Sequence, residues 1–199
     1  MNEMSLKYKD YFERSYAEHG ESIKTVGWNA KSQRQRFEVL CQIGDLEGKN
    51  ILDVGCGFGD FYDFLSKENI SIGGYVGVDI SERFINIARK RHPAIRLFCA
   101  DILDFQSLVR IDYSFASGIF FLCDLRWEEH FIAVCRKLLR ISDVGIGFNL
   151  LSVYSEKNDS GQHFARPWKI LKLVMEKISL KVVLRHDYRS NDFTIYVYK

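Results

Sequence analysis

The sequence lacks the features of several large protein classes. Its 199 residues include only two prolines and no low-complexity linker or internal repeat, which predicts one compact domain. No apolar run approaches the roughly 20 residues of a membrane span, and the charged N-terminus has no signal-peptide core. The net charge is only +2 and the basic residues are dispersed, so neither a membrane nor a DNA partner is predicted.

Paired cysteines are also missing. The five cysteines are well separated, form no C-x-x-C pair and are odd in number. This pattern predicts free, mostly buried thiols in a reducing cytoplasm, and no metal site. A catalytic cysteine is the alternative, but Cys56 and Cys99 lie in strand or turn segments, where a small apolar side chain is the expected role.

Apolar strands alternate with amphipathic helices along most of the chain, which predicts an α/β fold. Strands are expected at 50–54, 75–79, 95–100, 113–117, 144–150, 180–188 and 193–198, and helices at 4–19, 29–43, 60–68, 82–92, 127–140 and 167–177. The last two strands should form an antiparallel hairpin at one edge because only a short turn joins them. The predicted sheet is doubly wound, mostly parallel and seven-stranded, with helices on both faces.

A glycine-rich turn follows the first strand. Residues 51–59 read ILDVGCGFG, and glycine lets a ligand approach the main chain closely. The turn lies at the carboxyl end of a strand, where open α/β sheets bind ligands. A dinucleotide fingerprint would require its third glycine at position 60, which is Asp60, and a carboxylate there disfavours a pyrophosphate. The turn therefore indicates a cofactor without phosphates rather than NAD(P).

Segment 51–59 resembles motif I of the class I S-adenosylmethionine-dependent methyltransferases. That motif is hydrophobic-hydrophobic-Asp/Glu-hydrophobic-Gly-x-Gly-x-Gly, and every position matches. The family's parallel sheet also ends in an antiparallel hairpin, and the resemblance covers about residues 28–199. It implies S-adenosyl-L-methionine as the cofactor, with Asp53, Gly55 and Gly57 among the residues that bind it.

A second carboxylate follows the second predicted strand. Asp79 lies 20 residues after Gly59, at the position where an acid binds the ribose hydroxyls of a nucleoside. The alternative is that Asp79 only caps the next helix, but Ser81 can fill that role. The spacing therefore favours ribose binding by Asp79.

Four further positions take cofactor roles from the resemblance alone. It implies that Ile80 lies against the adenine, that Asp101 accepts a hydrogen bond from the adenine amino group, and that the Ile102 amide reaches a ring nitrogen. Ser117 would line the methionine part of the cofactor. The N/D-P-P-Y/F/W segment of enzymes that methylate DNA bases is absent after the fourth strand, which argues against that substrate.

Two residues upstream of motif I are also candidates. In quinone-pathway and related small-molecule methyltransferases, an arginine on the preceding helix holds the cofactor carboxylate, and Arg36 resembles it in placement. A solvated helix face is the alternative, and Arg34 is a rival. Trp28 either closes over the sulfonium by cation–π attraction or belongs to the core.

We expect one methyltransferase domain over 1–199, with 1–45 as a helical lid and 46–199 as a Rossmann-like core. Helix 4–19 and loop 151–168 should cover the pocket of a small-molecule O or N nucleophile, with His163 and His186 as candidate bases. A protein or RNA methyltransferase, and a cofactor-binding protein without transferase activity, remain alternatives. The sequence determines neither the methyl acceptor nor the oligomeric state.

Overall fold

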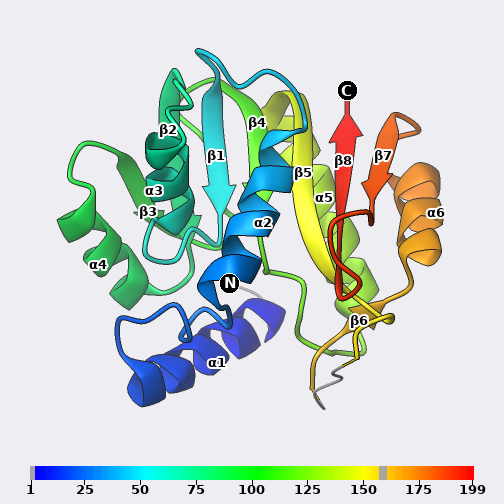
Figure 1. Cartoon of the computed structure of the whole chain (residues 1–199), viewed down its shortest axis with the longest axis horizontal. Helices are drawn as coiled ribbons and strands as arrows, with labels where there is room; N and C mark the ends of the chain where they lie inside the picture. Colours follow the sequence, from blue (N-terminus) through cyan, green and yellow to red (C-terminus); the bar gives the residue numbers. More distant parts are fainter. Residues whose placement is uncertain (1–2, 157–160) are drawn as a thin grey trace.

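The computed structural model describes residues 3–156 and 161–199, and a central β-sheet lies between two layers of helices (Figure 1). The strand order is β3-β2-β1-β4-β5-β8-β7. The strands are β1 (Asn50–Val54), β2 (Gly74–Asp79), β3 (Arg96–Cys99), β4 (Ile111–Ala116), β5 (Ser142–Ser152), β6 (Phe164–Ala165), β7 (Val182–Arg185) and β8 (Asp192–Tyr198). Strands β1 to β5 pair in parallel, whereas β8 runs antiparallel to both β5 and β7. The order reverses between β1 and β4, which creates a ligand-binding crevice at their carboxyl ends.

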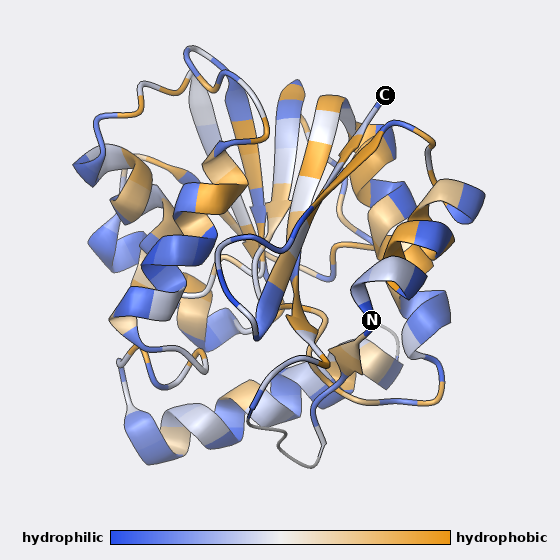
Figure 2. Ribbon diagram, turned by 45° about the vertical axis from the view of Figure 1, so that its right-hand side comes forward, coloured by the Kyte–Doolittle hydropathy of each residue, from blue (hydrophilic) through white to orange (hydrophobic). Residues whose placement is uncertain are grey.

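Helices cover both faces of the sheet, so consecutive strand residues are buried on opposite sides. The helices are α1 (Glu3–His19), α2 (Ala30–Cys41), α3 (Asp60–Lys67), α4 (Glu82–Arg91), α5 (Trp127–Ile141) and α6 (Pro167–Lys177). On one face, Leu40 and Phe61 pack in a cluster with Ile51, whereas Leu52 belongs to the opposite cluster with Phe131. Figure 2 shows the resulting pattern, with orange bands on the strands and on the helix sides that face them, and blue mainly on the outer helix surfaces.

Helix α1 lies apart from these two layers. It crosses below the carboxyl ends of the parallel strands (Figure 1). Its Tyr8 and Phe12 rings contact Phe121, and Phe12 also contacts Phe84 of α4. Ion pairs join it to the body at two points, Lys7 to Asp124 and Glu13 to Arg83. Within the described ranges, no helix combines the length and hydrophobicity that a membrane span requires.

The predicted fold class is confirmed, and the differences lie at the last strands. Strand β7 covers only Val182–Arg185 of the expected 180–188, because these four residues alone pair with β8 at the sheet edge. The two-residue β6 was not predicted, since it is too short to show an alternating pattern. The predicted cap is confirmed: the Ser81 hydroxyl accepts the Phe84 amide at the start of α4.

All five cysteines are free, as predicted, but the expectation that most are buried is wrong. Cys56 and Cys135 are buried, Cys41 is partly buried, and Cys99 and Cys123 are exposed. Cys99 ends β3, which has no neighbour on its outer side, and Cys123 lies in the loop before α5.

Candidate cofactor and acceptor site

The glycine turn joins β1 to α3 at the point where the strand order reverses. Gly55 has a φ of +73°, and a Cβ atom there would lie 2.4 Å from Cγ2 of Ile119. The left-handed conformation and the missing side chain are both required, which only glycine provides without strain. The Gly57 amide donates to Oδ2 of Asp79 at 2.9 Å, so the turn is tied to the end of β2.

Backbone donors fix the carboxylate of Asp79. Its side chain is 7 % exposed, and its Oδ1 accepts the Ser81 amide at 2.9 Å while Oδ2 accepts the Gly57 amide. Burial raises the pKa of Asp79, and these two amides oppose the shift by stabilising the ionised form. The hydroxyl of Ser81 caps α4, which leaves the remaining lone pairs of Asp79 for a ligand.

Asp53 is the second carboxyl beside the turn, and it has a strongly altered acidity. Burial raises its pKa to about 7, a hydrogen bond from the Tyr75 hydroxyl lowers it, and the charge of Asp79 raises it. Two buried carboxyls in one crevice create a negative region that favours a cation. A ligand with a positive charge near Asp53 would favour its ionised form.

Asp101 follows β3 and accepts two hydrogen bonds. Its Oδ1 accepts the Leu103 amide at 3.0 Å, and its Oδ2 accepts the hydroxyl of Ser5, from α1, at 2.6 Å. Ile80 and Ile102 line the same cavity, of about 70 Å³, which we call the Asp101 cavity. The side chain of Ser5 therefore occupies one acceptor position of this carboxylate.

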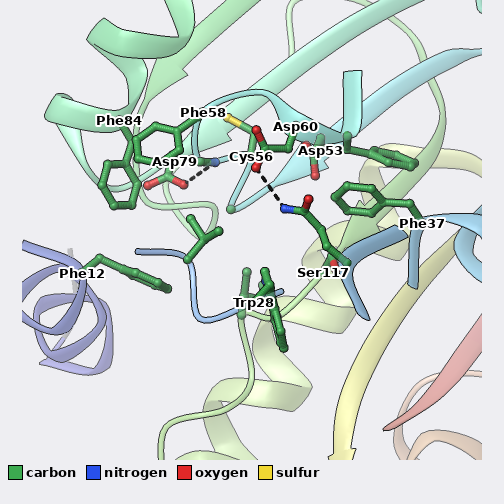
Figure 3. Close-up of a pocket in the computed structure, with 17 residues that line it drawn as sticks. Phe12, Trp28, Phe37, Asp53, Cys56, Phe58, Asp60, Asp79, Phe84 and Ser117 are labelled. Carbon is green, nitrogen blue, oxygen red and sulfur yellow. Dashed lines mark hydrogen bonds between the residues drawn. The ribbon is translucent and has the colours of Figure 1, made fainter. Parts of the chain in front are cut away.

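A second small cavity of about 60 Å³, here called the turn cavity, lies along the glycine turn. It shares Phe12, Gly55, Asp79 and Ile119 with the Asp101 cavity, so the two cavities adjoin. Figure 3 shows Phe12 and Trp28 across the turn cavity from Asp53 and Asp79. All predicted cofactor residues except Arg36 line one of these two cavities, namely Trp28, Asp53, Gly55, Gly57, Asp79, Ile80, Asp101, Ile102 and Ser117.

Several lining residues were not predicted as site residues. The turn cavity is also lined by the aromatic side chains Phe37, Phe58 and Phe84, and the Asp101 cavity by His130. Aromatic spacing in 4–19 indicated a covering helix, but not which ring would reach the site. Phe58 lies within the glycine motif at a position that the motif leaves free, so no sequence signal marks it.

A third cavity, of about 320 Å³, adjoins the turn cavity, because Val26 and Trp28 line both. We call it the arginine cavity, since Arg36 and Arg189 line it. The Arg36 guanidinium lies over the Trp28 ring, with Cζ 3.3 Å from the ring centroid, and Trp28 in turn fills the space beside Gly118. Arg36 thus lies behind Trp28 and outside the lining of the turn cavity. Arg34 is half exposed and pairs with Glu38 and Glu68.

Neither predicted base lines any of the three cavities. The His163 ring stacks on Trp127 with centroids 3.8 Å apart, and burial lowers its pKa. His186 lies near Tyr154 and its Nε2 is 3.1 Å from the Ser190 carbonyl. Residues 157–160 of the expected covering loop lie outside the described residues, whereas Leu151, Ser155 and Phe164 of that loop line the arginine cavity.

The hydrogen-bonding groups of these two cavities fit a nucleoside that carries a cationic sulfur substituent. Asp79 offers acceptors for ribose hydroxyls, Asp101 offers one for an amino group, and the bare turn admits a ligand against the main chain. Among the residues that the structure describes, none that lines the turn cavity or the Asp101 cavity is a lysine or arginine that would bind a diphosphate. Fold and site together define a Rossmann-like, class I methyltransferase that uses S-adenosylmethionine.

Comparison with known proteins agrees with this class. The family described as "Methyltransferase domain" matches residues 51–142. A Mycobacterium tuberculosis protein named as a methyltransferase, Rv1506c, is 33 % identical over 159 residues, which cover 75 % of this chain and 93 % of that protein. The chain belongs to this methyltransferase family.

Two further similarities are more distant. Trans-aconitate 2-methyltransferase of an Acidovorax species is 28 % identical over 57 % of this chain, but the match spans only 42 % of that enzyme. Magnesium protoporphyrin IX methyltransferase of Synechocystis, solved with bound S-adenosylmethionine, has a TM-score of 0.69 at 15 % identity, over 100 % of this chain and 98 % of that one. The latter similarity supports the fold.

Proposed function

We propose that this methyltransferase methylates an oxygen or nitrogen atom of a small molecule that binds in the arginine cavity. The observation that carries the proposal is the position of that cavity, which meets the turn cavity at Val26 and Trp28. Its volume of about 320 Å³ falls in the range of small-molecule sites, from about 300 Å³ upward. An acceptor there would face the reactive end of a cofactor bound along the turn.

The predicted cofactor residues that line the turn and Asp101 cavities keep their proposed roles in this arrangement. Asp79 would bind the ribose, the Asp101 cavity would take the adenine, and Asp53 would lie near the charged methionine end. S-adenosylmethionine supplies a methyl group activated by its sulfonium, so the chain has mainly to align the acceptor and exclude water. The aromatic rings of Phe12 and Trp28 would provide that exclusion.

We further propose that residues 1–45 act as a lid on the core formed by 46–199. The turn and Asp101 cavities measure only about 60 and 70 Å³, and the Ser5 hydroxyl occupies Asp101. A nucleoside needs more room, so α1 would move outward when the cofactor enters. This motion would also open the arginine cavity, since Tyr11 of α1 lines it.

Alignment rather than base catalysis is the mechanism we favour. His163 packs on Trp127, and neither it nor His186 lines the arginine cavity. We expect His163→Ala and His186→Ala to retain turnover at neutral pH. A large loss of kcat with unchanged KM in either variant would restore that histidine as a base.

Labelled methyl transfer tests the proposed function. S-adenosylhomocysteine should bind in a calorimetric titration and NAD should not. Incubation with methyl-labelled S-adenosylmethionine and a small-molecule extract should label low-molecular-mass products. Label found only in protein or RNA would favour the alternative of a macromolecular acceptor, and the small-molecule proposal would then be wrong.

A further inference from the structure

The arginine cavity contains a buried guanidinium whose hydrogen bonds are mostly unmade. Arg36 is 2 % exposed, and its Nη2 donates to Oδ1 of Asp192. Its Nε and Nη1 have no hydrogen-bond partner among residues 3–156 and 161–199. Buried donors are nearly always paired, and an unpaired one costs about 1–3 kcal/mol. Arg36 therefore requires another acceptor.

The charges around this cavity do not balance. Arg36 and Arg189 share one carboxylate, Asp192, whose Oδ2 is 3.6 Å from Nε of Arg189. Of the described residues that line the cavity, these two arginines are the only charged ones, and the rest are apolar or neutral polar. Two guanidinium groups and one carboxylate leave one positive charge, which an anion within the cavity would neutralise.

Neighbouring side chains hold both guanidinium groups in place. The Trp28 ring lies under Arg36. Arg189 donates from Nε to Asn191 at 2.9 Å and from Nη1 to Gln35 at 3.0 Å. A guanidinium that is fixed before binding loses little entropy when it binds a carboxylate, which makes the pair strong and specific.

We propose that Arg36 and Arg189 bind a carboxylate of the methyl acceptor, so that the substrate is an organic acid. The inference rests on the proposed function, because it takes the arginine cavity as the acceptor site. The methionine carboxylate of the cofactor is the other source of this chemistry. The acceptor is favoured because Arg36 lines the arginine cavity but not the turn cavity, where the Trp28 ring covers its guanidinium.

Binding of simple organic acids to the enzyme loaded with S-adenosylhomocysteine tests the inference. The probes are mono-, di- and tricarboxylates of four to nine carbons, each paired with its fully methylated ester, in calorimetric titrations. At least one acid should bind, and its ester should bind about tenfold to a hundredfold more weakly, as expected for loss of a charged hydrogen bond. Equal affinity for acids and esters, or no binding of any acid, would overturn the inference.

Three arginine variants test which residues bind the carboxylate. Arg189→Ala and Arg36→Lys should each weaken the bound acid about tenfold or more, and Arg36→Lys keeps a charge beside Asp192 so that the fold survives. Arg34→Ala is the matched control, because Arg34 lies on the same helix but pairs with Glu38 and Glu68 on the surface. Unchanged affinity for the acid in both test variants would also overturn the inference.

Two cofactor probes separate the two sources of the carboxylate. S-adenosylhomocysteine carries the methionine carboxylate, whereas 5′-methylthioadenosine lacks it. Arg36→Lys should leave both affinities unchanged. A loss confined to S-adenosylhomocysteine would assign Arg36 to the cofactor, and the inference would be wrong while the proposed function stands. Methylation of neutral or cationic small molecules but of no acid would also contradict the inference and leave the proposed function in place. Methylation of macromolecules alone would contradict the proposed function itself.

Discussion

The proposed cofactor side and the proposed acceptor side of this methyltransferase are built in different ways. On the cofactor side, Asp79 and Asp101 accept amides of residues two positions further along the chain, so local backbone positions them. On the acceptor side, Arg36 is positioned by Asp192, which lies 156 residues away in the sequence. Backbone support needs only the strand and its turn, whereas the arginine cavity needs α2 and β8 to meet.

Because of this difference, the two sides should tolerate mutations differently. An aspartate on the cofactor side can be replaced while its strand remains paired, because the backbone amides that donate to it can donate to water instead. The buried Arg36–Asp192 pair has no such substitute, because both side chains are at most 2 % exposed. We therefore expect mutations on the cofactor side to affect mainly binding, and mutations of the buried pair to affect mainly folding.

The largest effect is expected from Arg36→Met. It leaves the buried Asp192 carboxylate with only Arg189, whose Nε is 3.6 Å away, and breaking a buried ion pair costs about 3–5 kcal/mol of the free energy of unfolding. Chemical denaturation measures this loss. The double variant Arg36→Met/Asp192→Asn should recover part of it, and Arg34→Met should change stability by less than about 1 kcal/mol because its ion pairs are on the surface. If Arg36→Met were as stable as Arg34→Met, the contrast between the two sides would fail.

Asp79→Ala should have the next largest effect, on binding. Loss of a charged acceptor for the ribose should weaken the binding of S-adenosylhomocysteine by about 1.5–3 kcal/mol, or tenfold to a hundredfold, with the fold retained. Calorimetric titration gives the affinity, and the carboxylate probes of the arginine cavity should bind as before. Glu82→Ala, an exposed change in the first turn of α4, is the control. An unchanged affinity in Asp79→Ala would refute the ribose assignment.

The two sides also differed in how far the sequence predicted them. The three acids lie near or just after the ends of successive predicted strands, and a parallel sheet brings such strand ends together. Spacing for Asp79 and the motif resemblance for Asp53 and Asp101 therefore predicted three residues that do line adjoining cavities. The Arg36–Asp192 pair and the contact of Ser5 with Asp101 join segments 156 and 96 residues apart. No local pattern encodes such contacts, because they depend on how α1, α2 and β8 pack.

The acidity of Asp53 gives a pH test of the cofactor side. Folding raises its pKa from the ordinary 3.8 to about 7 through burial. If the ammonium group at the methionine end of the cofactor needs Asp53 in its ionised form, the affinity for S-adenosylhomocysteine should rise about tenfold from pH 6 to pH 8, because the ionised fraction of Asp53 rises by that factor. Asp53→Asn should bind with little change over this range. A wild-type affinity that stays constant from pH 6 to pH 8 would contradict the assignment.

The raised pKa of Asp53 predicts the opposite pH trend for the stability of the fold. The folded protein holds the Asp53 proton more tightly than the unfolded chain. The contribution of Asp53 to stability is therefore complete below about pH 4 and is lost as the pH rises through about 7. Other buried groups titrate as well, so the measured quantity is the difference in free energy of unfolding between wild type and Asp53→Asn. This difference should shift in favour of the variant as the pH rises from 4 to 8.

The smallest effect concerns the lid, where the two sides meet. The Ser5 hydroxyl donates to Oδ2 of Asp101 at 2.6 Å, so it competes with an adenine amino group for that oxygen. Ser5→Ala removes the competing donor, and affinity for both S-adenosylhomocysteine and 5′-methylthioadenosine should increase about two- to tenfold, the value of one hydrogen bond. Ser15→Ala is the matched control, because Ser15 lies on the same helix as Ser5, its hydroxyl donates to the Thr25 carbonyl at 2.9 Å, and neither Ser15 nor Thr25 lines any of the three cavities. Weaker binding in Ser5→Ala would mean that α1 helps to hold the cofactor instead of excluding it, and the closed lid would then be part of the bound state.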